Sequence, residues 1–180
     1  TGSNMAGKTT FLRAAGICAI LAETIATCAA RRWHAPPLRI ATHIDRGDDI
    51  VEGKSYFLVE AEAVRELLAR ADGEEQHLFI VDEIFRGTNT RERIAAAKAV
   101  LDRLDRGDHI CLVSTHDLEL LDLLGERWEF KHFRETVHDG GVRFDFLIRP
   151  GASSAKVVGD AGGGVGETTM AASPPLCPCP

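Results

Sequence analysis

The sequence predicts an α/β fold, a mostly parallel β-sheet flanked by helices with an antiparallel hairpin at one edge. Short apolar runs that suit buried strands alternate with segments of helical periodicity, the order that produces a parallel sheet with right-handed crossovers. Two β-rich segments near the end of this alternation flank Asp139-Gly140-Gly141, a typical hairpin turn. A composition of 44% hydrophobic and 27% charged residues over 180 positions suits one globular domain with a buried core.

The individual elements follow from local patterns. Helices are predicted where apolar residues recur at helical spacing, over about residues 8–30, 55–70 and 91–105. Strands are predicted over about residues 38–42, 77–81, 109–114, 128–137 and 142–148, where short runs are rich in strand-forming residues. The first helix is expected to be buried, with Phe11, Ala15, Ala19 and Ala22 on its apolar stripe.

Charge and composition exclude several classes of protein. The net charge of −6 argues against a basic nucleic-acid-binding module, because an acidic chain repels the phosphate backbone on average. The most apolar stretch, Ala14–Ala22, is far shorter than the ~20 residues of a membrane span, so no membrane helix is expected. Five cysteines are an odd number, which favours reduced thiols and a cytoplasmic protein over paired disulfides.

The first residues carry a phosphate-loop motif, GSNMAGKT, which matches G-x-x-x-x-G-K-[ST]. Glycines let the backbone bend so that successive N–H groups point at phosphate oxygens, and the helix that follows directs its positive dipole end at the same anion. Lys8 would add a cation to the β- and γ-phosphates, and Thr9 a hydroxyl to Mg²⁺. The alternative is a glycine-rich turn before a helix. The candidate nucleotide-binding residues in this motif are Gly2, Ser3, Asn4, Met5, Ala6, Gly7, Lys8, Thr9 and Thr10.

Two carboxylates follow the apolar run Leu78–Val81, the pattern expected of a Walker B segment. A central parallel strand would carry Asp82 to the sheet edge that also holds the phosphate loop, where Asp82 can hold Mg²⁺. Glu83 would then accept a hydrogen bond from the attacking water and orient or deprotonate it. Such an acidic pair can also be an ordinary solvated turn, a reading that the upstream phosphate loop makes less favourable.

A third candidate is His116, which follows the next buried strand in Ser114-Thr115-His116-Asp117. At this edge its imidazole could hydrogen-bond the γ-phosphate or the attacking water and so sense the triphosphate. By itself, a histidine at the end of a strand is equally consistent with a simple surface residue.

Together, the segments TGSNMAGKTTFLR, DDIVEGKSYFLVE, DEIFRGTNT and STHD closely resemble, in order and spacing, the ATPase domain of the MutS family of DNA mismatch repair proteins. The resemblance runs from Thr1 to about Lys156. The residues of the phosphate-loop segment resemble the divergent MutS-related branch more than the main repair proteins. It implies a P-loop NTPase fold of ABC-like type, with ATP and Mg²⁺ bound between two domains that dimerise head to tail. It also implies that DNA is bound by upstream domains that this chain lacks.

The resemblance further implies a role for each matched residue. Asn4, Lys8 and Thr9 bind phosphates, Asp82 holds Mg²⁺, Glu83 is the catalytic carboxylate and His116 is the switch histidine. Ser55, in GKSYF, does the work of the ABC signature serine and reaches the γ-phosphate of the partner domain. Ser55 also stands at the predicted start of a helix, where serine is favoured simply as an N-cap, and the two roles can coexist.

The domain is predicted to span residues 1–156. Because the chain begins inside the phosphate loop, it is expected to be a fragment that lacks the first strand of the domain. Residues 157–180 are rich in Gly and Pro and are expected to be a disordered tail. The abrupt change of composition after Lys156 suggests a non-native tail that follows a frame change or an assembly artefact.

Two other functions are compatible with the phosphate loop. A P-loop kinase would transfer phosphate to a small acceptor, but the adjacent Asp82 and Glu83, with the histidine at the next strand end, favour water as the acceptor. The chain could also be an inactive, truncated remnant without turnover. Phosphate release with and without candidate acceptors separates the first alternative from an ATPase, and thermal melting with and without Mg·ATP tests the second.

Overall fold

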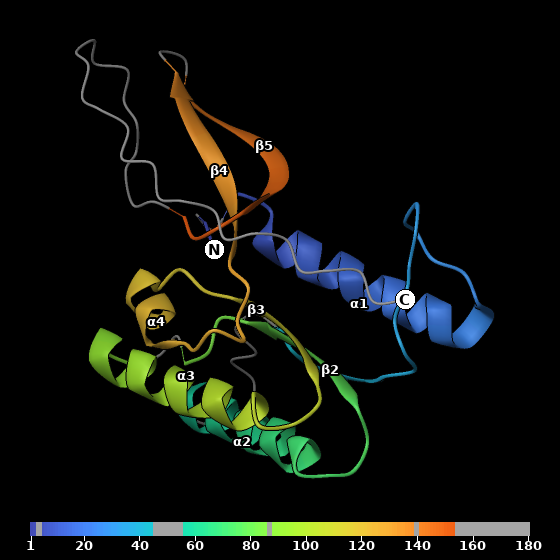
Figure 1. Cartoon of the computed structure of the whole chain (residues 1–180). Helices are drawn as coiled ribbons and strands as arrows, with labels where there is room; N and C mark the ends of the chain where they lie inside the picture. Colours follow the sequence, from blue (N-terminus) through green and yellow to red (C-terminus); the bar gives the residue numbers. More distant parts are fainter. Residues whose placement is uncertain (3–4, 45–55, 86–87, 139–140, 154–180) are drawn as a thin grey trace.

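A computed structural model describes residues 1–2, 5–44, 56–85, 88–138 and 141–153 of the chain (Figure 1). It has a three-stranded parallel sheet and a separate antiparallel pair, joined by helices. Helices and strands alternate until the final hairpin, which confirms the predicted mixed α/β class. The elements are α1 (Lys8–Ile25), β1 (Arg39–His43), α2 (Tyr56–Ala71), β2 (His77–Asp82), α3 (Thr90–Leu104), β3 (Ile110–Ser114), α4 (Leu118–Leu123), β4 (Lys131–His138) and β5 (Gly141–Pro150).

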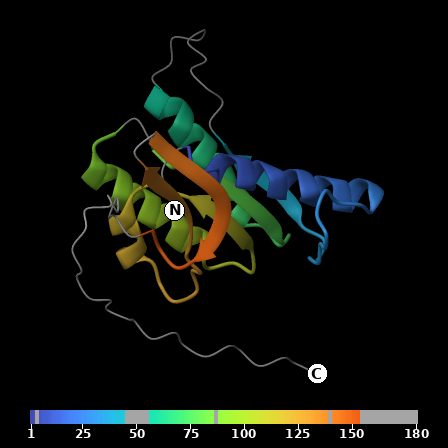
Figure 2. The ribbon, with the colours of Figure 1, turned by 90° about the horizontal axis from the view of Figure 1, so that it is seen from above.

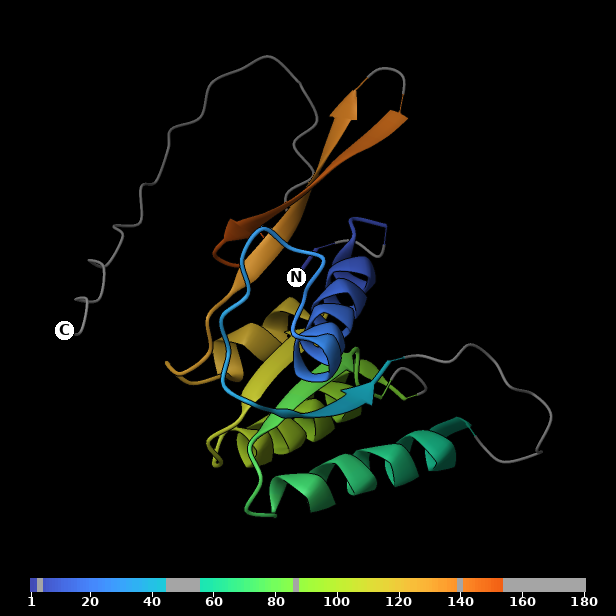
Figure 3. The ribbon, with the colours of Figure 1, turned by 90° about the vertical axis from the view of Figure 1, so that its right-hand side faces the viewer.

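The parallel sheet has the order β1-β2-β3, so β2 is its central strand. Helix α1 covers one face of this sheet, whereas α2 and α3 pack together on the opposite face (Figure 3). Every residue of β2 is buried, as expected of a strand that is covered on both faces. The three layers therefore fix the position and direction of β2, which ends at Asp82.

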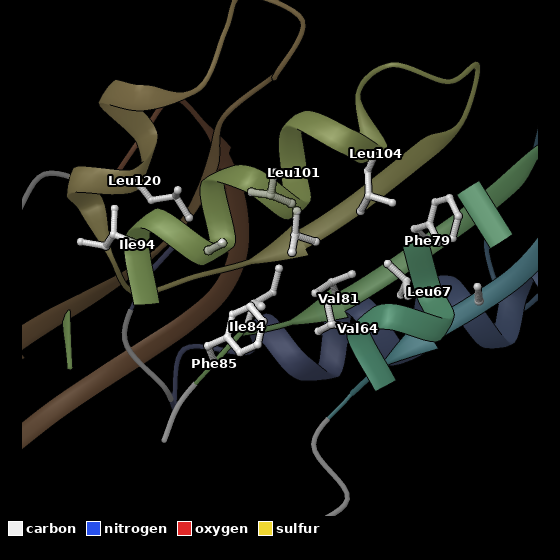
Figure 4. Packing of buried hydrophobic residues seen from close by; sticks show 13 residues of the cluster. Val64, Leu67, Phe79, Val81, Ile84, Phe85, Ile94, Leu101, Leu104 and Leu120 are labelled. Atoms are coloured by element: carbon white, nitrogen blue, oxygen red, sulfur yellow. The ribbon is translucent and has the colours of Figure 1, made fainter. Parts of the chain in front are cut away.

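Alternate side chains of β2 build two different cores. Phe79 and Val81 point toward α2 and α3, where they pack with Val64, Leu101 and neighbouring apolar residues (Figure 4). Leu78 and Ile80 belong to the second core, beneath α1. Since successive side chains of a strand face opposite sides of the sheet, one short apolar run supplies both cores.

Helix α1 is less buried than the sequence predicts. Of the predicted stripe, Ala19 is buried, Ala15 and Ala22 are half-buried and Phe11 is exposed. Leu12 and Gly16 are buried as well, although the predicted stripe did not include them. The helix ends at Ile25, before the predicted Ala30, and the next residue adopts a left-handed conformation. Its far end extends past the strands (Figure 2), and Ile17, Ile20 and Ile25 are at least half exposed. An apolar, alanine-rich segment predicts a helix but does not indicate how many sides of it are covered.

The hairpin of β4 and β5 does not form an edge of the parallel sheet, contrary to the sequence prediction. These strands form a two-stranded sheet of their own, above the body of the molecule (Figure 1). A cavity of about 140 Å³ lies between them and the open side of β3, lined by residues 111–115 of β3 and its following turn and by residues 128–131 leading into β4. The turn residues predicted that the two arms pair with each other, but they carry no information about which neighbouring strand the hairpin meets.

Thr1 lies alongside β4 and makes strand-like hydrogen bonds with it. The Thr1 amine donates to the carbonyl of Lys131 at 2.6 Å, and the amide of Phe133 donates to the carbonyl of Thr1 at 3.0 Å. This is the alternating pattern of a parallel bridge. The start of the phosphate loop is thus held against the hairpin.

The sequence also gives expectations about membrane helices and about the cysteines. Within the described ranges, no helix combines the length and the hydropathy that a membrane crossing requires. Cys18, Cys28 and Cys111 are free thiols, and burial raises the pKa of Cys111 to about 11. Cys177 and Cys179, with the rest of the predicted tail, lie outside the described residues.

The core between β2 and α3 yields a prediction about stability. Leu101 is 1% exposed among Phe79, Val81 and Leu104, so Leu101→Ala should lower the free energy of unfolding by about 2–5 kcal/mol through lost burial and a residual cavity. Chemical denaturation measures this change. Leu58→Ala, at a position 49% exposed on α2, is the matched control and should cost less than about 1 kcal/mol. Equal losses in the two variants would contradict the assigned core.

Candidate functional site

The phosphate-loop segment lies where α1 begins. Gly2 and Gly7 have φ angles of +128° and +104°, a conformation that other residues rarely adopt. A Cβ atom on Gly2 would lie 2.8 Å from the carbonyl oxygen of Phe133, so the close passage of β4 also requires glycine at position 2. Ala6 is fully buried, whereas Met5 and Thr10 are exposed. Ser3 and Asn4, two further predicted phosphate ligands, lie outside the described residues.

Helix α1 begins directly after this segment without a side-chain cap. Gly7 is the N-cap residue, and it has no side chain that could cap the first amides of the helix. The N-terminus of an α-helix carries N–H groups without intrahelical partners and the positive end of the helix dipole. The first turn of α1, which contains Lys8, Thr9 and Thr10, is therefore suited to an anion.

A hydrogen bond connects this helix to the central strand. The hydroxyl of Thr9 donates to Asp82 Oδ2 at 2.6 Å, and the hydroxyl of Ser114 donates to Asp82 Oδ1. Asp82 is 2% exposed, and a buried carboxylate is costly unless hydrogen bonds compensate it. Thr9 and Asp82, the two predicted magnesium ligands, are therefore in direct contact.

Ser114 is a member of this site that sequence reasoning did not single out. It is the last residue of β3 and the register partner of Asp82 in the parallel sheet. Once β2 and β3 are taken as neighbouring parallel strands that end together, the polar residue closing β3 is the signal that identifies it.

Glu83 lies beside Lys8 and His116. Glu83 Oε1 is 3.8 Å from Lys8 Nζ and 3.2 Å from His116 Nδ1. Lys8 and Glu83 are both buried, at 4% and 8% exposure, whereas the His116 side chain is 43% exposed. Lys8 Nζ also donates to the carbonyl of Gly2, which keeps the ammonium group at the loop. The five side chains expected to meet at this edge of the sheet form two contact groups, Thr9 with Asp82 and Lys8 with Glu83 and His116. The groups are adjacent because Lys8 precedes Thr9 and Asp82 precedes Glu83 in the chain.

A further ion pair extends the site toward α3. Arg93 donates two hydrogen bonds to Asp117, at 2.8 and 2.6 Å, and both side chains are largely buried. Asp117 Oδ1 is also 3.7 Å from His116 Nε2. The hydrogen bonds from Arg93 hold the pKa of Asp117 below its ordinary value, and Asp117 in turn raises the pKa of Arg93. Sequence analysis missed Arg93 because nothing in a helical segment indicates which of its charges faces a site.

The oxygen atoms of this edge fit a magnesium ion. Within the described ranges, no group of three or more His, Cys, Asp or Glu side chains could hold a metal by itself. Mg²⁺ is usually bound through one or two carboxylates together with water and substrate phosphates rather than by a cage made only of protein. A hydroxyl and a carboxylate in contact, next to a helix N-terminus and a buried lysine, match that mode of binding.

Ser55, the predicted contact to a partner domain, lies outside the described residues. Helix α2 begins one residue later, at Tyr56. Downstream, Asn89 is the N-cap of α3, and its side chain accepts a hydrogen bond from the amide of Glu92 at 3.0 Å.

These features define a class of protein, a three-layer α/β domain whose phosphate-loop motif meets an acidic pair at the carboxyl edge of a parallel sheet. The chain belongs to the MutS family, since its residues 1–161 match the family model of MutS domain V. This confirms the family that the four sequence motifs indicated.

Curated relatives give the same assignment. The chain is 36% identical over 159 residues to the DNA mismatch repair protein MutS of Natronomonas pharaonis, and 37% identical over 155 residues to that of Thermus aquaticus. It is 34% identical over 159 residues to DNA mismatch repair protein MutS 2 of Haloarcula marismortui. Each match covers 86% of this chain but only 17–19% of the relative, so the chain spans less than a fifth of their length.

The ion pair of Arg93 and Asp117 predicts how stability depends on pH. Because the pKa of Asp117 is lowered from 3.8 in the folded state, its contribution is complete above 3.8 and is lost as the pH falls through the lower folded value. Asp117→Asn should lower the free energy of unfolding at pH 7 by about 1–2 kcal/mol and flatten its decline in acid. Urea denaturation between pH 2 and 7, roughly the range over which carboxylates titrate, measures both effects.

The control for this prediction is Asp122→Asn, at an exposed position of α4. It should leave the free energy of unfolding within about 0.5 kcal/mol of wild type throughout the titration. A pH profile of Asp117→Asn that runs parallel to that of wild type would contradict the pairing.

Proposed function

We propose that this chain is the ATP-binding and ATP-hydrolysing domain of a MutS-like protein, and that its turnover drives a conformational cycle on DNA. The observation that carries the proposal is the 2.6 Å hydrogen bond between Thr9 and Asp82, with Lys8 and Glu83 beside it. Family membership supports the same function, because the relatives are DNA mismatch repair proteins by name. Membership in the divergent MutS-related branch, which the residues of the phosphate-loop segment indicate, stays a prediction.

In the proposed mechanism, the loop and the first turn of α1 bind the triphosphate of ATP. Lys8 supplies a buried positive charge, and the amides of the helix N-terminus supply hydrogen-bond donors. Thr9 and Asp82 would hold Mg²⁺, which when bound neutralises charge on the β- and γ-phosphates. These groups act mainly by positioning and electrostatics, which supply most of the catalysis in phosphoryl transfer.

Glu83 is proposed as the group that orients the attacking water. Its carboxylate would accept a proton of the water as the water oxygen attacks the γ-phosphorus, and the bond to the bridging oxygen breaks to release ADP and phosphate. His116 lies 3.2 Å from the same carboxylate and is exposed enough to meet the γ-phosphate or the water. The contacts of Glu83 with Lys8 and His116 thus link phosphate binding to the position of the carboxylate that orients the water.

The partners are proposals as well. ATP would be buried between two copies that associate head to tail, with Ser55 of one copy completing the γ-phosphate site of the other. DNA contact would come from domains outside this chain, because the acidic balance of the chain does not suit the phosphate backbone. A cytoplasmic location, which the odd number of cysteines indicates, is part of this proposal.

The roles of Lys8 and Glu83 are separable by mutation. Lys8→Ala should weaken ATP binding by at least about a hundredfold, because a buried charge-assisted contact to phosphate is lost. Glu83→Gln should bind ATP normally but lower kcat by roughly 10²–10⁴-fold. Fluorescent-nucleotide titration measures the first effect, and phosphate release the second.

Two variants away from the site serve as controls, Lys98→Ala at a half-buried position of α3 and Glu126→Gln at an exposed position after α4. Both should bind and hydrolyse ATP as wild type does. Wild-type turnover by Glu83→Gln would argue against the assignment of Glu83, and unchanged ATP affinity of Lys8→Ala would argue against the phosphate loop.

ATP should also promote dimerisation, because a γ-phosphate site completed by a second copy links nucleotide affinity to association. Glu83→Gln with Mg·ATP is the best sample, since bound ATP would persist. Light scattering should show the mass doubling on addition of Mg·ATP, and Lys8→Ala should remain at the mass without nucleotide. A Glu83→Gln sample that binds ATP and keeps an unchanged mass would contradict the proposed arrangement.

A further inference from the structure

The short segment after β2 has an unusual backbone. Glu83 and Phe85 have φ angles of +55° and +61°, in the left-handed region that residues with side chains seldom adopt. Two such residues in a three-residue segment need surrounding structure to hold them. Since the Glu83 carboxylate depends on this backbone for its direction, whatever holds the segment also sets the position of the carboxylate.

Part of the segment is held by packing. Ile84 and Phe85 are buried at 6% and 8% exposure, in the same apolar cluster as Val64 and Val81 (Figure 4). At its other end, the amide of Glu83 donates to the carbonyl of Ser114 at 3.1 Å, which continues the ladder from β2 to β3. Apolar packing fixes the depth of a side chain but is not directional, so it does not by itself fix the rotation of the peptide groups.

At Phe85, a directional contact comes from Glu60 on α2. Glu60 Oε1 accepts a hydrogen bond from the amide of Phe85 at 2.5 Å, and the residue is 6% exposed. The same oxygen lies 3.8 Å from Nε2 of His43, the last residue of β1. Burying a carboxylate costs free energy that an apolar side chain of similar size would not, so a buried glutamate is a poor choice for packing alone.

We propose that Glu60 is a positioning residue for ATP hydrolysis, which acts by holding the Phe85 amide and thereby the backbone that directs the Glu83 carboxylate. This inference rests on the proposed ATPase function. Glu60 lies on α2, across the sheet from α1 and its Lys8, so its removal should leave the phosphate-binding groups in place. The expected signature is a loss of turnover without a loss of ATP affinity.

Three variants of the chain test this inference. Glu60→Met removes the acceptor but retains the volume of the side chain, Glu60→Gln retains a weaker, neutral acceptor oxygen, and Glu66→Met changes an exposed glutamate of the same helix. For each variant, ATP affinity, kcat and the hydrogen exchange of the Phe85 amide are measured. The exchange measurement reports on the hydrogen bond independently of activity.

Glu60→Met should lower kcat by about tenfold to a hundredfold, since a small misplacement of a catalytic group has effects of this size. Its Kd for ATP should stay within about twofold of wild type, and its Phe85 amide should exchange faster. Glu60→Gln should be intermediate in both kcat and exchange, and Glu66→Met should match wild type. If Glu60→Met does not fold, the intermediate kcat and unchanged Kd of Glu60→Gln support the inference on their own.

The measurements separate an error in the role of Glu60 from an error in the proposed ATPase function. A wild-type chain that hydrolyses ATP, together with wild-type kcat in Glu60→Gln and in any folded Glu60→Met, would overturn this inference alone. Parallel losses of ATP affinity and kcat in Glu60→Gln would also overturn it, because they indicate a general structural role. A wild-type chain that hydrolyses no ATP would overturn the proposed function and this inference with it.

Discussion

The hydrogen bond from Thr9 to Asp82 is the contact around which the site is arranged. It joins the first turn of α1 to the end of β2, two segments 73 residues apart in the chain. Asp82 is buried away from solvent, so its carboxylate requires hydrogen bonds from other groups of the protein. The hydroxyls of Thr9 and Ser114 meet that requirement from two different elements. The chemistry of one carboxylate thereby places the phosphate-loop segment, the central strand and the neighbouring strand in a single arrangement.

Packing of the central strand β2 in both cores fixes the positions of the site residues at its end. Its residues supply apolar side chains to both helical layers, so any shift of β2 along its axis would disturb two cores at once. The acidic pair therefore stands at the end of the most constrained strand of the parallel sheet. Beyond Asp82 the chain leaves the strand with left-handed residues, and from there contacts of individual side chains, including that of Glu60, replace the regular ladder.

Charge is distributed along a connected path at this edge of the sheet. Arg93 is paired with Asp117, Asp117 approaches His116, and His116 and Lys8 both approach Glu83. Arg93 with Asp117, and Lys8 with Glu83, are pairs of opposite charge, which lowers the cost of burying the members of each pair. A protonation change or an anion at one point of such a path alters the field at the others. This property suits a site that has to distinguish nucleotide states, the role proposed for this member of the MutS family.

The local elements and the motif residues of this protein could be predicted from its amino-acid order. Periodicity located the main helices and strands to within a few residues, except the short α4 and the exact end of α1, because these patterns are set by which side chains must be buried. The motifs identified Lys8, Asp82 and Glu83, since their chemistry depends on residue type and short-range spacing.

The relations between distant segments depend on the packing of the three layers. The tertiary structure separated the hairpin from the parallel sheet, exposed one side of α1, and brought Ser114, Arg93 and Glu60 to the site. None of these has a local signature, because pairing between distant strands and the direction of a helix face depend on how the layers pack and not on neighbours in the chain.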